Sequence, residues 1–133
     1  MNLKRFIGAT VVLVVFLYFY EWLIHGVLLM NTYNETPNLW RPMQQMQSMM
    51  SLSLLFRVLM GGWFTYIFTK FHKDGGVENG LRFGCYLGIF AGIMAASTFM
   101  WLPISAKLAW AWFINNIVQF VAGGAIIGSI YRK

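Results

Sequence analysis

Three ionisable residues lie inside segments that are otherwise almost entirely apolar. Glu21 and His25 are four residues apart near the end of the first such segment, and Arg57 interrupts the second. Residues at i and i+4 share one face of a helix, so we expect Glu21 and His25 to point the same way. Ionisable groups inside a membrane are costly, and they face protein or water rather than lipid. These three residues are therefore the first candidates for a functional site.

An ion pair between Glu21 and Arg57 is the chemistry that these residue types favour most directly. A helix rises about 1.5 Å per residue, which places both side chains and Gln119 roughly 10–16 Å inside the same ends of their segments. Pairing offsets part of the cost of holding each charge in hydrocarbon. The predicted polar cluster comprises Tyr18, Glu21, His25, Arg57, Asn115, Asn116 and Gln119.

Three roles are open for this cluster. It could fix the register of the helices, or it could bind a polar head group, a quinone or a small solute. It could also carry protons, because histidine titrates near neutral pH. We prefer the structural role. Haem ligation by two histidines of one chain is not expected, because His25 and His72 should lie at opposite ends of the helices.

A methionine-rich segment precedes the second apolar stretch. Met43, Met46 and Met50 are spaced by three and four residues, which puts them on one helical face. Clustered thioethers suit copper as Cu(I), a soft metal. An interfacial amphipathic turn, with methionine as an adaptable apolar filler, explains the same pattern. We prefer the turn, and we predict no cofactor for this chain.

Composition indicates the elements that must position these residues. The chain has 133 residues, of which 59% are hydrophobic and 11% are charged, and its mean hydropathy is +0.61. An ordinary soluble domain has roughly 25% charged residues, and a membrane-spanning helix takes about 20 residues. Apolar stretches of sufficient length occupy about 6–30, 48–71, 81–102 and 108–131. We therefore predict one all-α membrane domain over residues 1–133, a bundle of four transmembrane helices.

Basic residues indicate how these helices are oriented. Lys and Arg outnumber Asp and Glu by ten to four, giving a net charge of +6. They lie mainly between the apolar stretches, which is a topology signal and not the basic stripe of a nucleic-acid-binding protein. One side of the arrangement holds Lys4, Arg5, Lys70, Lys73, Arg82, Arg132 and Lys133, and the other holds Arg41 and Lys107. We expect both termini in the cytoplasm and a prokaryotic inner membrane as the location.

Small residues form a row on the third apolar stretch and continue on the fourth. A row at spacing four lets a second helix approach closely, so that packing contacts replace lipid contacts. The second helix could belong to this chain or to another subunit, and we prefer packing within the chain. The small residues are Gly80, Gly84, Gly88, Gly92, Ala96, Gly124 and Gly128.

Reaction motifs are missing from the sequence. It contains no P-loop, GxSxG or HExxH motif, and of its four acidic residues Glu21 alone lies inside an apolar stretch. We therefore do not expect catalysis by this chain alone.

We expect a small integral membrane protein that is a non-catalytic accessory or structural subunit of a larger complex. Its expected partners are the lipid bilayer and other membrane subunits or copies of itself, and not nucleic acid. The alternatives are a small transporter or channel, and a quinone- or haem-associated redox protein.

Overall fold

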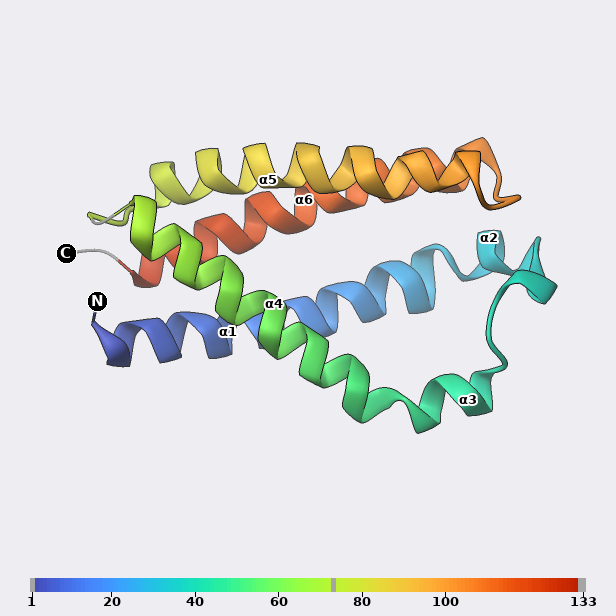
Figure 1. The fold of residues 1–133 in the computed structure, drawn as a ribbon, viewed down its shortest axis with the longest axis horizontal. Coiled ribbons are helices and arrows are strands. Elements are labelled where there is room, and N and C mark those ends of the chain that lie inside the picture. Colours follow the sequence, from blue (N-terminus) through green and yellow to red (C-terminus); the bar gives the residue numbers. More distant parts are fainter. Residues whose placement is uncertain (1, 73, 132–133) are drawn as a thin grey trace.

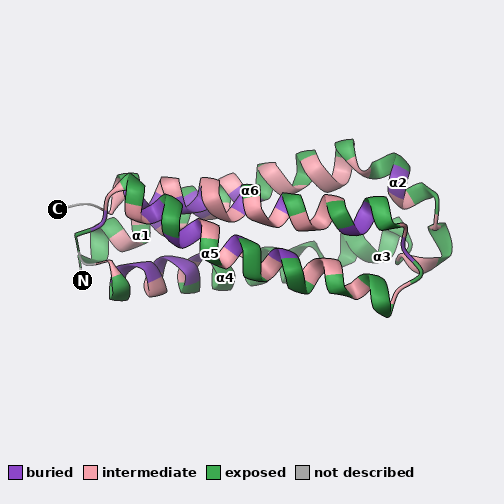
Figure 2. Cartoon of the chain, turned by 90° about the horizontal axis from the view of Figure 1, so that it is seen from above, coloured by how far each residue is buried: buried purple, intermediate pink, exposed green. Residues whose placement is uncertain are grey.

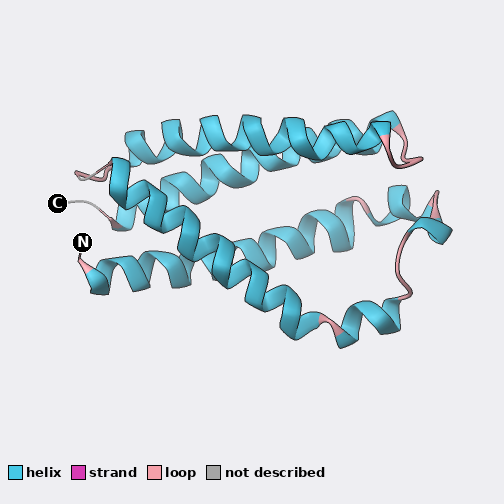
Figure 3. Cartoon of the chain, in the orientation of Figure 1, coloured by secondary structure: helices cyan, strands magenta, loops and turns pink. Residues whose placement is uncertain are grey.

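Four long helices dominate the computed structural model, which describes residues 2–72 and 74–131. They are α1 (Leu3–Leu23), α4 (Met50–Phe71), α5 (Val77–Ser97) and α6 (Ala106–Ile130) (Figure 1). Each is part of a helical segment long and apolar enough to cross a membrane, and no strand occurs in the described part of the chain (Figure 3). This confirms the all-helical fold with four candidate spans. Three residues of the charge count, Lys73, Arg132 and Lys133, lie outside the described residues.

Short helices fill the connection between α1 and α4. A π-helix, η1 (Ile24–Leu28), continues α1. It is followed by α2 (Met30–Asn34), the 3-10 helix η2 (Pro37–Leu39) and α3 (Met43–Ser48). A further 3-10 helix, η3 (Thr98–Met100), ends the third span. The connection is therefore a largely helical segment and not an extended loop.

The long helices pack in the order α4, α1, α6, α5. Helices α5 and α6 form a tight antiparallel hairpin, and α1 contacts both α4 and α6 (Figure 1). The first and last described residues, Asn2 and Tyr131, lie together at one end, which we call the terminal end; the opposite end, with α2 and α3, is the loop end. Near the terminal end α4 meets α5, where the ring of Phe83 lies 4.9 Å from Phe64 and 5.6 Å from Phe68 between centroids. Toward the loop end, α4 diverges from α5 and α6.

Buried apolar side chains form two separate clusters. The first lies in the terminal half and comprises Ala9, Leu13, Leu17, Phe64, Phe68, Phe83 and Ile127. The second lies at the loop end around Leu108, where Tyr33, Trp40 and Trp112 pack against it. Exposed residues follow the outward faces of the long helices (Figure 2), and many of them are large and apolar, such as Trp63 and Phe90. These faces suit a lipid environment, which solvates apolar side chains without cost.

The row of glycines on α5 faces α6 of the same chain. A Cβ atom at Gly84 would overlap the main-chain oxygen of Phe120 and lie 2.8 Å from the Cα of Val121. Gly80 and Gly124 face each other backbone to backbone, so a Cβ on either would overlap the carbonyl oxygen of the other. The small residues therefore let these two helices approach until their main chains touch.

The same contact extends along the hairpin in both directions. A Cβ at Gly88 would lie 2.9 Å from the Cα of Ile117, and Gly92 faces Phe113. Half-buried Ala96 continues the row toward the loop end. At the terminal end, the N–H of Gly76 donates to the carbonyl of Gly128 at 3.0 Å.

Candidate functional site

An ion pair joins α1 to α4 in the loop-end half of the bundle. The Nε and Nη2 atoms of Arg57 donate to the same carboxylate oxygen of Glu21, Oε2, at 2.8 and 2.6 Å. The side chains are 20% and 22% exposed, respectively. This is the pairing that residue type and depth predicted, and it neutralises two charges that would otherwise be costly in hydrocarbon.

Further contacts connect the ion pair to a third helix and fix its orientation. The amide of Gln119 on α6 donates from Nε2 to Oε1 of Glu21 at 3.1 Å. Nη1 of Arg57 donates to the hydroxyl of Ser53, one turn away on α4. The Tyr18 ring lies 5.6 Å from the Cζ of Arg57, in reach of a cation–π contact. Glu21 therefore ties together α1, α4 and α6.

Beside the ion pair lies an open cavity of about 410 Å³, which we call the polar cavity. All four long helices contribute to it, although α5 contributes only small side chains and α4 contributes Met60. Its polar wall brings together Glu21, His25, Asn115, Asn116 and Gln119, five residues of the predicted cluster. The lining comprises Glu21, His25, Tyr33, Met60, Ala91, Ala95, Trp112, Asn115, Asn116, Gln119 and Phe120.

Asn115, one of the lining residues, holds a buried acceptor without a partner in the described part of the chain. The residue is 8% exposed, and no donor among the described residues lies within hydrogen-bond reach of its Oδ1 atom. Buried polar atoms in proteins nearly always have a partner, so an exception calls for an explanation. The Oδ1 atom has less than 1 Å² of accessible surface, so it does not face the open space of the cavity.

An aromatic network closes the cavity at the loop end. The indole N–H of Trp112 donates to the hydroxyl oxygen of Tyr33 at 2.9 Å, and Nδ1 of His25 lies 2.6 Å from the same oxygen. Because an indole N–H can only donate, the phenolic hydrogen of Tyr33 is free to donate to His25. The indole of Trp40 donates to the main-chain oxygen of Tyr33 at 3.1 Å. The chain reaches this position through the π-helix η1, a rare element that is frequent at functional sites.

A Tyr33→Phe variant is expected to lower the free energy of unfolding by about 1–2 kcal/mol, because Trp112 and His25 both lose their partner. Tyr86→Phe, on an exposed side chain of α5, is the matched control and should have little effect. Thermal unfolding in detergent, followed by tryptophan fluorescence, measures both.

The effect of Tyr33→Phe should also depend on pH. Burial raises the pKa of Tyr33 above 10.0, and the hydrogen bond from Trp112 offsets part of this. A raised pKa stabilises the neutral phenol, so this stabilisation is complete below pH 10.0 and is lost as the pH rises through the folded-state value. The stability difference between wild type and variant should shrink above pH 10.0. A difference that stays constant would contradict the buried role of this hydroxyl.

A second cavity, of about 420 Å³, lies on the other side of the ion pair. Glu21 and Met60 line both cavities, whereas Ser53 and Arg57 belong to this one. Apolar side chains make up the remainder of its wall, among them Leu52 and Phe56. The Glu21–Arg57 pair therefore stands between two open spaces. Glu21 lines both cavities, and Arg57 lines the second cavity.

The remaining candidate ligands are not brought into the site. Met43 and Met46 lie on α3, but Met50 begins α4 after a break at Met49, so the three do not share one continuous helix. All three are exposed. Among the described residues, no group of three or more His, Cys, Asp or Glu side chains could hold a metal ion. His72 stacks on Phe68 near the terminal end, far along the bundle from His25.

Six lining residues lie outside the predicted cluster: Tyr33, Met60, Ala91, Ala95, Trp112 and Phe120. Tyr33 lies in a segment of turn-forming residues, where nothing in the sequence marks it as facing a helix so far along the chain. Ala91 and Ala95 are on α5 beside the glycine row, and their small size is the signal that could have indicated a space. Trp112 lies on α6 and donates a hydrogen bond to the hydroxyl of Tyr33.

Comparisons with models of protein families, with curated proteins and with solved structures give no match.

Proposed function

We propose that this integral membrane protein binds a small molecule in the polar cavity. The observation that carries the proposal is an open cavity of about 410 Å³ whose wall brings Glu21, His25, Asn115, Asn116 and Gln119 together. Ligand sites are typically concave and mostly apolar, with a few convergent polar groups. The cavity has this character, and it lies between helices of a bundle, where such sites commonly occur.

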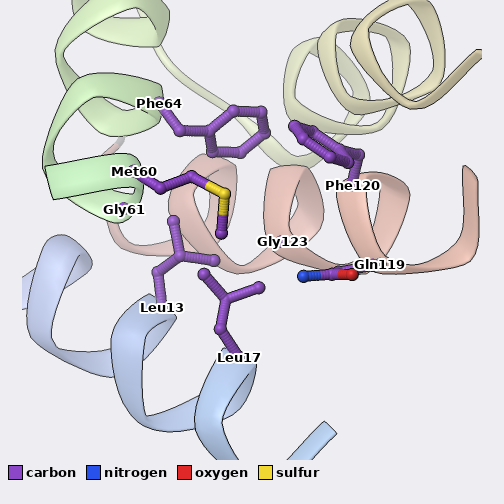
Figure 4. Close-up of a pocket in the computed structure, with 8 residues that line it drawn as sticks. All are labelled: Leu13, Leu17, Met60, Gly61, Phe64, Gln119, Phe120 and Gly123. Atoms are coloured by element: carbon purple, nitrogen blue, oxygen red, sulfur yellow. The ribbon is translucent and has the colours of Figure 1, made fainter. Parts of the chain in front are cut away.

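The packing beyond the cavity favours binding over conduction. On the terminal side, Met60, Gln119 and Phe120 separate it from an apolar cavity of about 10 Å³, a volume that suits one water molecule at most. Figure 4 shows Leu13, Leu17 and Phe64 around this smaller space. Beyond it the helices are joined by the first apolar cluster. The polar cavity therefore does not continue to the terminal end of the bundle. In this conformation the described residues offer no polar route along which a channel would conduct.

An accessory role in a larger complex stays a prediction. The glycine row was one of the reasons to expect another subunit, and in this structure α6 packs against it. The exposed apolar faces suit lipid as well as they suit a protein partner. Neither feature distinguishes an accessory subunit from a protein that functions alone.

We also propose that the terminal end faces the cytoplasm of a prokaryotic cell. Of the described basic residues outside the helix centres, Lys4, Arg5, Lys70 and Arg82 lie toward this end, and Arg41 and Lys107 lie toward the loop end. An excess of Lys and Arg marks the cytoplasmic side of an inner-membrane protein. In this orientation the polar cavity lies in the outer half of the membrane.

Filling the cavity should abolish binding. Ala95 lines the cavity, so Ala95→Phe is expected to displace the bound molecule without removing a polar group. Ile93→Phe is the matched control, because Ile93 is on the same helix and is 56% exposed on an outward face. Native mass spectrometry after gentle extraction should show a retained small-molecule mass on the wild type and on Ile93→Phe, and not on Ala95→Phe.

The same spectra separate the other candidates. Equal retention by Ala95→Phe and wild type, or no small molecule on any form, would contradict the proposal. A protein partner at fixed stoichiometry in every spectrum would support the accessory role.

A further inference from the structure

The second cavity, of about 420 Å³, differs from the polar cavity in the helices that form it. Its lining consists of Glu21 on α1 and of residues between Met49 and Met60 at the start of α4. No described residue of α5 or α6 lines it. The side chains of Met49, Leu52 and Phe56 are exposed, so this cavity opens at the surface of the bundle, which in a membrane is covered by lipid.

Arg57 brings hydrogen-bond donors to this cavity and does not line the polar cavity. A guanidinium group has five N–H donors. Nε and Nη2 each donate one N–H to Oε2 of Glu21, and Nη1 donates one to the hydroxyl of Ser53. The terminal nitrogens Nη1 and Nη2 each carry a second N–H, and these two have no partner among the residues that the structure describes.

Donors exceed open acceptors on the polar side of this cavity. Oε2 of Glu21 accepts two N–H groups from Arg57, and a carboxylate oxygen has two lone pairs. Oε1 accepts from Gln119, which belongs to the wall of the polar cavity. The hydroxyl of Ser53 accepts from Arg57, so its own hydrogen is a further donor. Hydrogen bonds from a charged donor are the stronger kind, so a molecule in this cavity gains most from an acceptor oxygen.

The charge balance favours a neutral acceptor over an anion. Glu21 and Arg57 form a neutral pair, and they are the ionisable residues of this lining. An anion would approach the Glu21 carboxylate and leave a net charge in mostly apolar surroundings, which is costly. A carbonyl oxygen accepts from the guanidinium without adding a charge.

The guanidinium group lies nearer the loop end of α4 than the Cα atom of Arg57 does. Side chains on a helix lean toward its N-terminus, which for α4 is the loop end, and the contact from Nη1 to Ser53 fixes this direction. Ser53 is three residues after Met50, where α4 begins, or roughly 5 Å along the axis. The 22 residues of α4 match the hydrocarbon thickness of about 30 Å. The free N–H groups therefore lie near the edge of the hydrocarbon, where ester carbonyls join the acyl chains of a phospholipid to its glycerol.

We propose that the second cavity holds a phospholipid by an ester carbonyl, to which Arg57 donates from its terminal nitrogens. The acyl chain of this lipid lies along Leu52, Phe56 and Met60, where burial of apolar surface is favourable in proportion to the area covered. The Glu21–Arg57 pair then has a second role, because Glu21 orients the guanidinium toward lipid. This site does not depend on the function proposed for the polar cavity.

A matched pair of lipids tests the carbonyl contact. Dimyristoylphosphatidylcholine and its ditetradecyl ether analogue share the head group and the chain length, and the diester lipid alone has carbonyl groups. The full-length protein is purified in a mild detergent with an equimolar mixture of the two, and native mass spectrometry identifies the lipid that stays bound longest. The wild type is expected to retain the diester lipid in about fivefold excess, the difference that one net hydrogen bond supplies.

Two variants should abolish this excess in different ways. The double variant Glu21→Gln, Arg57→Gln removes the guanidinium without leaving an uncompensated charge, and it should retain the two lipids equally. Ser53→Phe keeps the ion pair and fills the cavity in front of Arg57, so it should also lose the preference. Ser51→Phe is the matched control, because Ser51 is an exposed serine of the same helix that does not line the cavity. It should behave like the wild type.

Several outcomes would overturn the inference. Equal retention of both lipids by the wild type, or no retained lipid, would do so. An unchanged excess of the diester lipid on the double variant or on Ser53→Phe would place the ester contact elsewhere on the protein. These results are independent of Ala95→Phe, the test of the polar cavity, so failure of one proposal leaves the other standing.

An anionic competitor tests the charge argument. In an equimolar mixture of the diester phosphatidylcholine and a diether phosphatidylglycerol, the wild type should retain a larger share of the diester lipid than the double variant does. A smaller share on the wild type would mean that Arg57 binds an anionic head group, and it would overturn the assignment to a carbonyl.

Discussion

Glu21→Gln is expected to lower the free energy of unfolding by about 3 kcal/mol, the lower end of the cost of breaking a buried ion pair. The variant leaves the guanidinium of Arg57 without its counter-ion, and an arginine cannot lose its proton in a protein. Arg57→Gln should cost less, about half as much, because the remaining carboxylate of Glu21 can take up a proton and become neutral. The double variant should be more stable than Glu21→Gln alone, since no uncompensated charge remains.

Unfolding in detergent, followed by tryptophan fluorescence, measures this order. The exposed pair of Glu78 and Arg82 is the matched control: its atoms are also 2.6 Å apart, but its side chains are 68–78% exposed. Neutralising that pair should change stability by less than about 0.5 kcal/mol, because water solvates both groups. A loss in the double variant equal to the sum of the two single losses would show that Glu21 and Arg57 contribute no coupling.

Gly84→Ala is expected to be as disruptive as Glu21→Gln. It should lower the free energy of unfolding by about 3 kcal/mol, at the upper end of the cost of overpacking. The added methyl group would meet main-chain atoms of Phe120 and Val121, and main chain cannot move aside as a flexible side chain can. The α5–α6 hairpin must therefore open. Because α6 contributes Asn115 and Gln119 to the cavity, the variant should also weaken binding.

Gly8→Ala is the control for the intrinsic effect of replacing glycine in a helix. A Cβ at Gly8 meets nothing within 4 Å, so the change should be neutral or stabilising by up to about 1 kcal/mol. Light scattering of the purified proteins gives a second measurement. If Gly84→Ala left the fold stable and changed the oligomeric state, the row would be acting between subunits instead of within the chain.

Local composition was sufficient to predict the helices. A long apolar stretch must satisfy its own backbone hydrogen bonds in lipid, and a helix does so without reference to the rest of the chain. The predicted spans differ from the observed helices mainly at their ends, as in the first span, where α1 ends at Leu23 and η1 continues to Leu28. The exact ends depend on local capping and on π- or 3-10 turns, which hydropathy does not report.

The ion pair could be anticipated for a similar reason. Glu21 and Arg57 are conspicuous because charge is rare inside the apolar stretches, and their estimated depths allowed them to meet. Residue type and rise per residue indicate which groups need a partner at which level of the membrane. Nothing comparable marked Tyr33, whose partner Trp112 is 79 residues away in the chain.

The sequence by itself determined that this protein has four apolar helices, a charged pair that needs burial together, and small residues that permit close helix packing. These are properties of single residues and of periodicity along one helix. The tertiary structure alone decided that the glycine row faces α6, that α4 diverges from α5, and that a cavity opens beside Asn115. Such features depend on helix crossing angles, which arise from side-chain contacts between distant segments. The bundle is held by the first apolar cluster toward the terminal end, whereas α4 diverges from the α5–α6 hairpin toward the loop end.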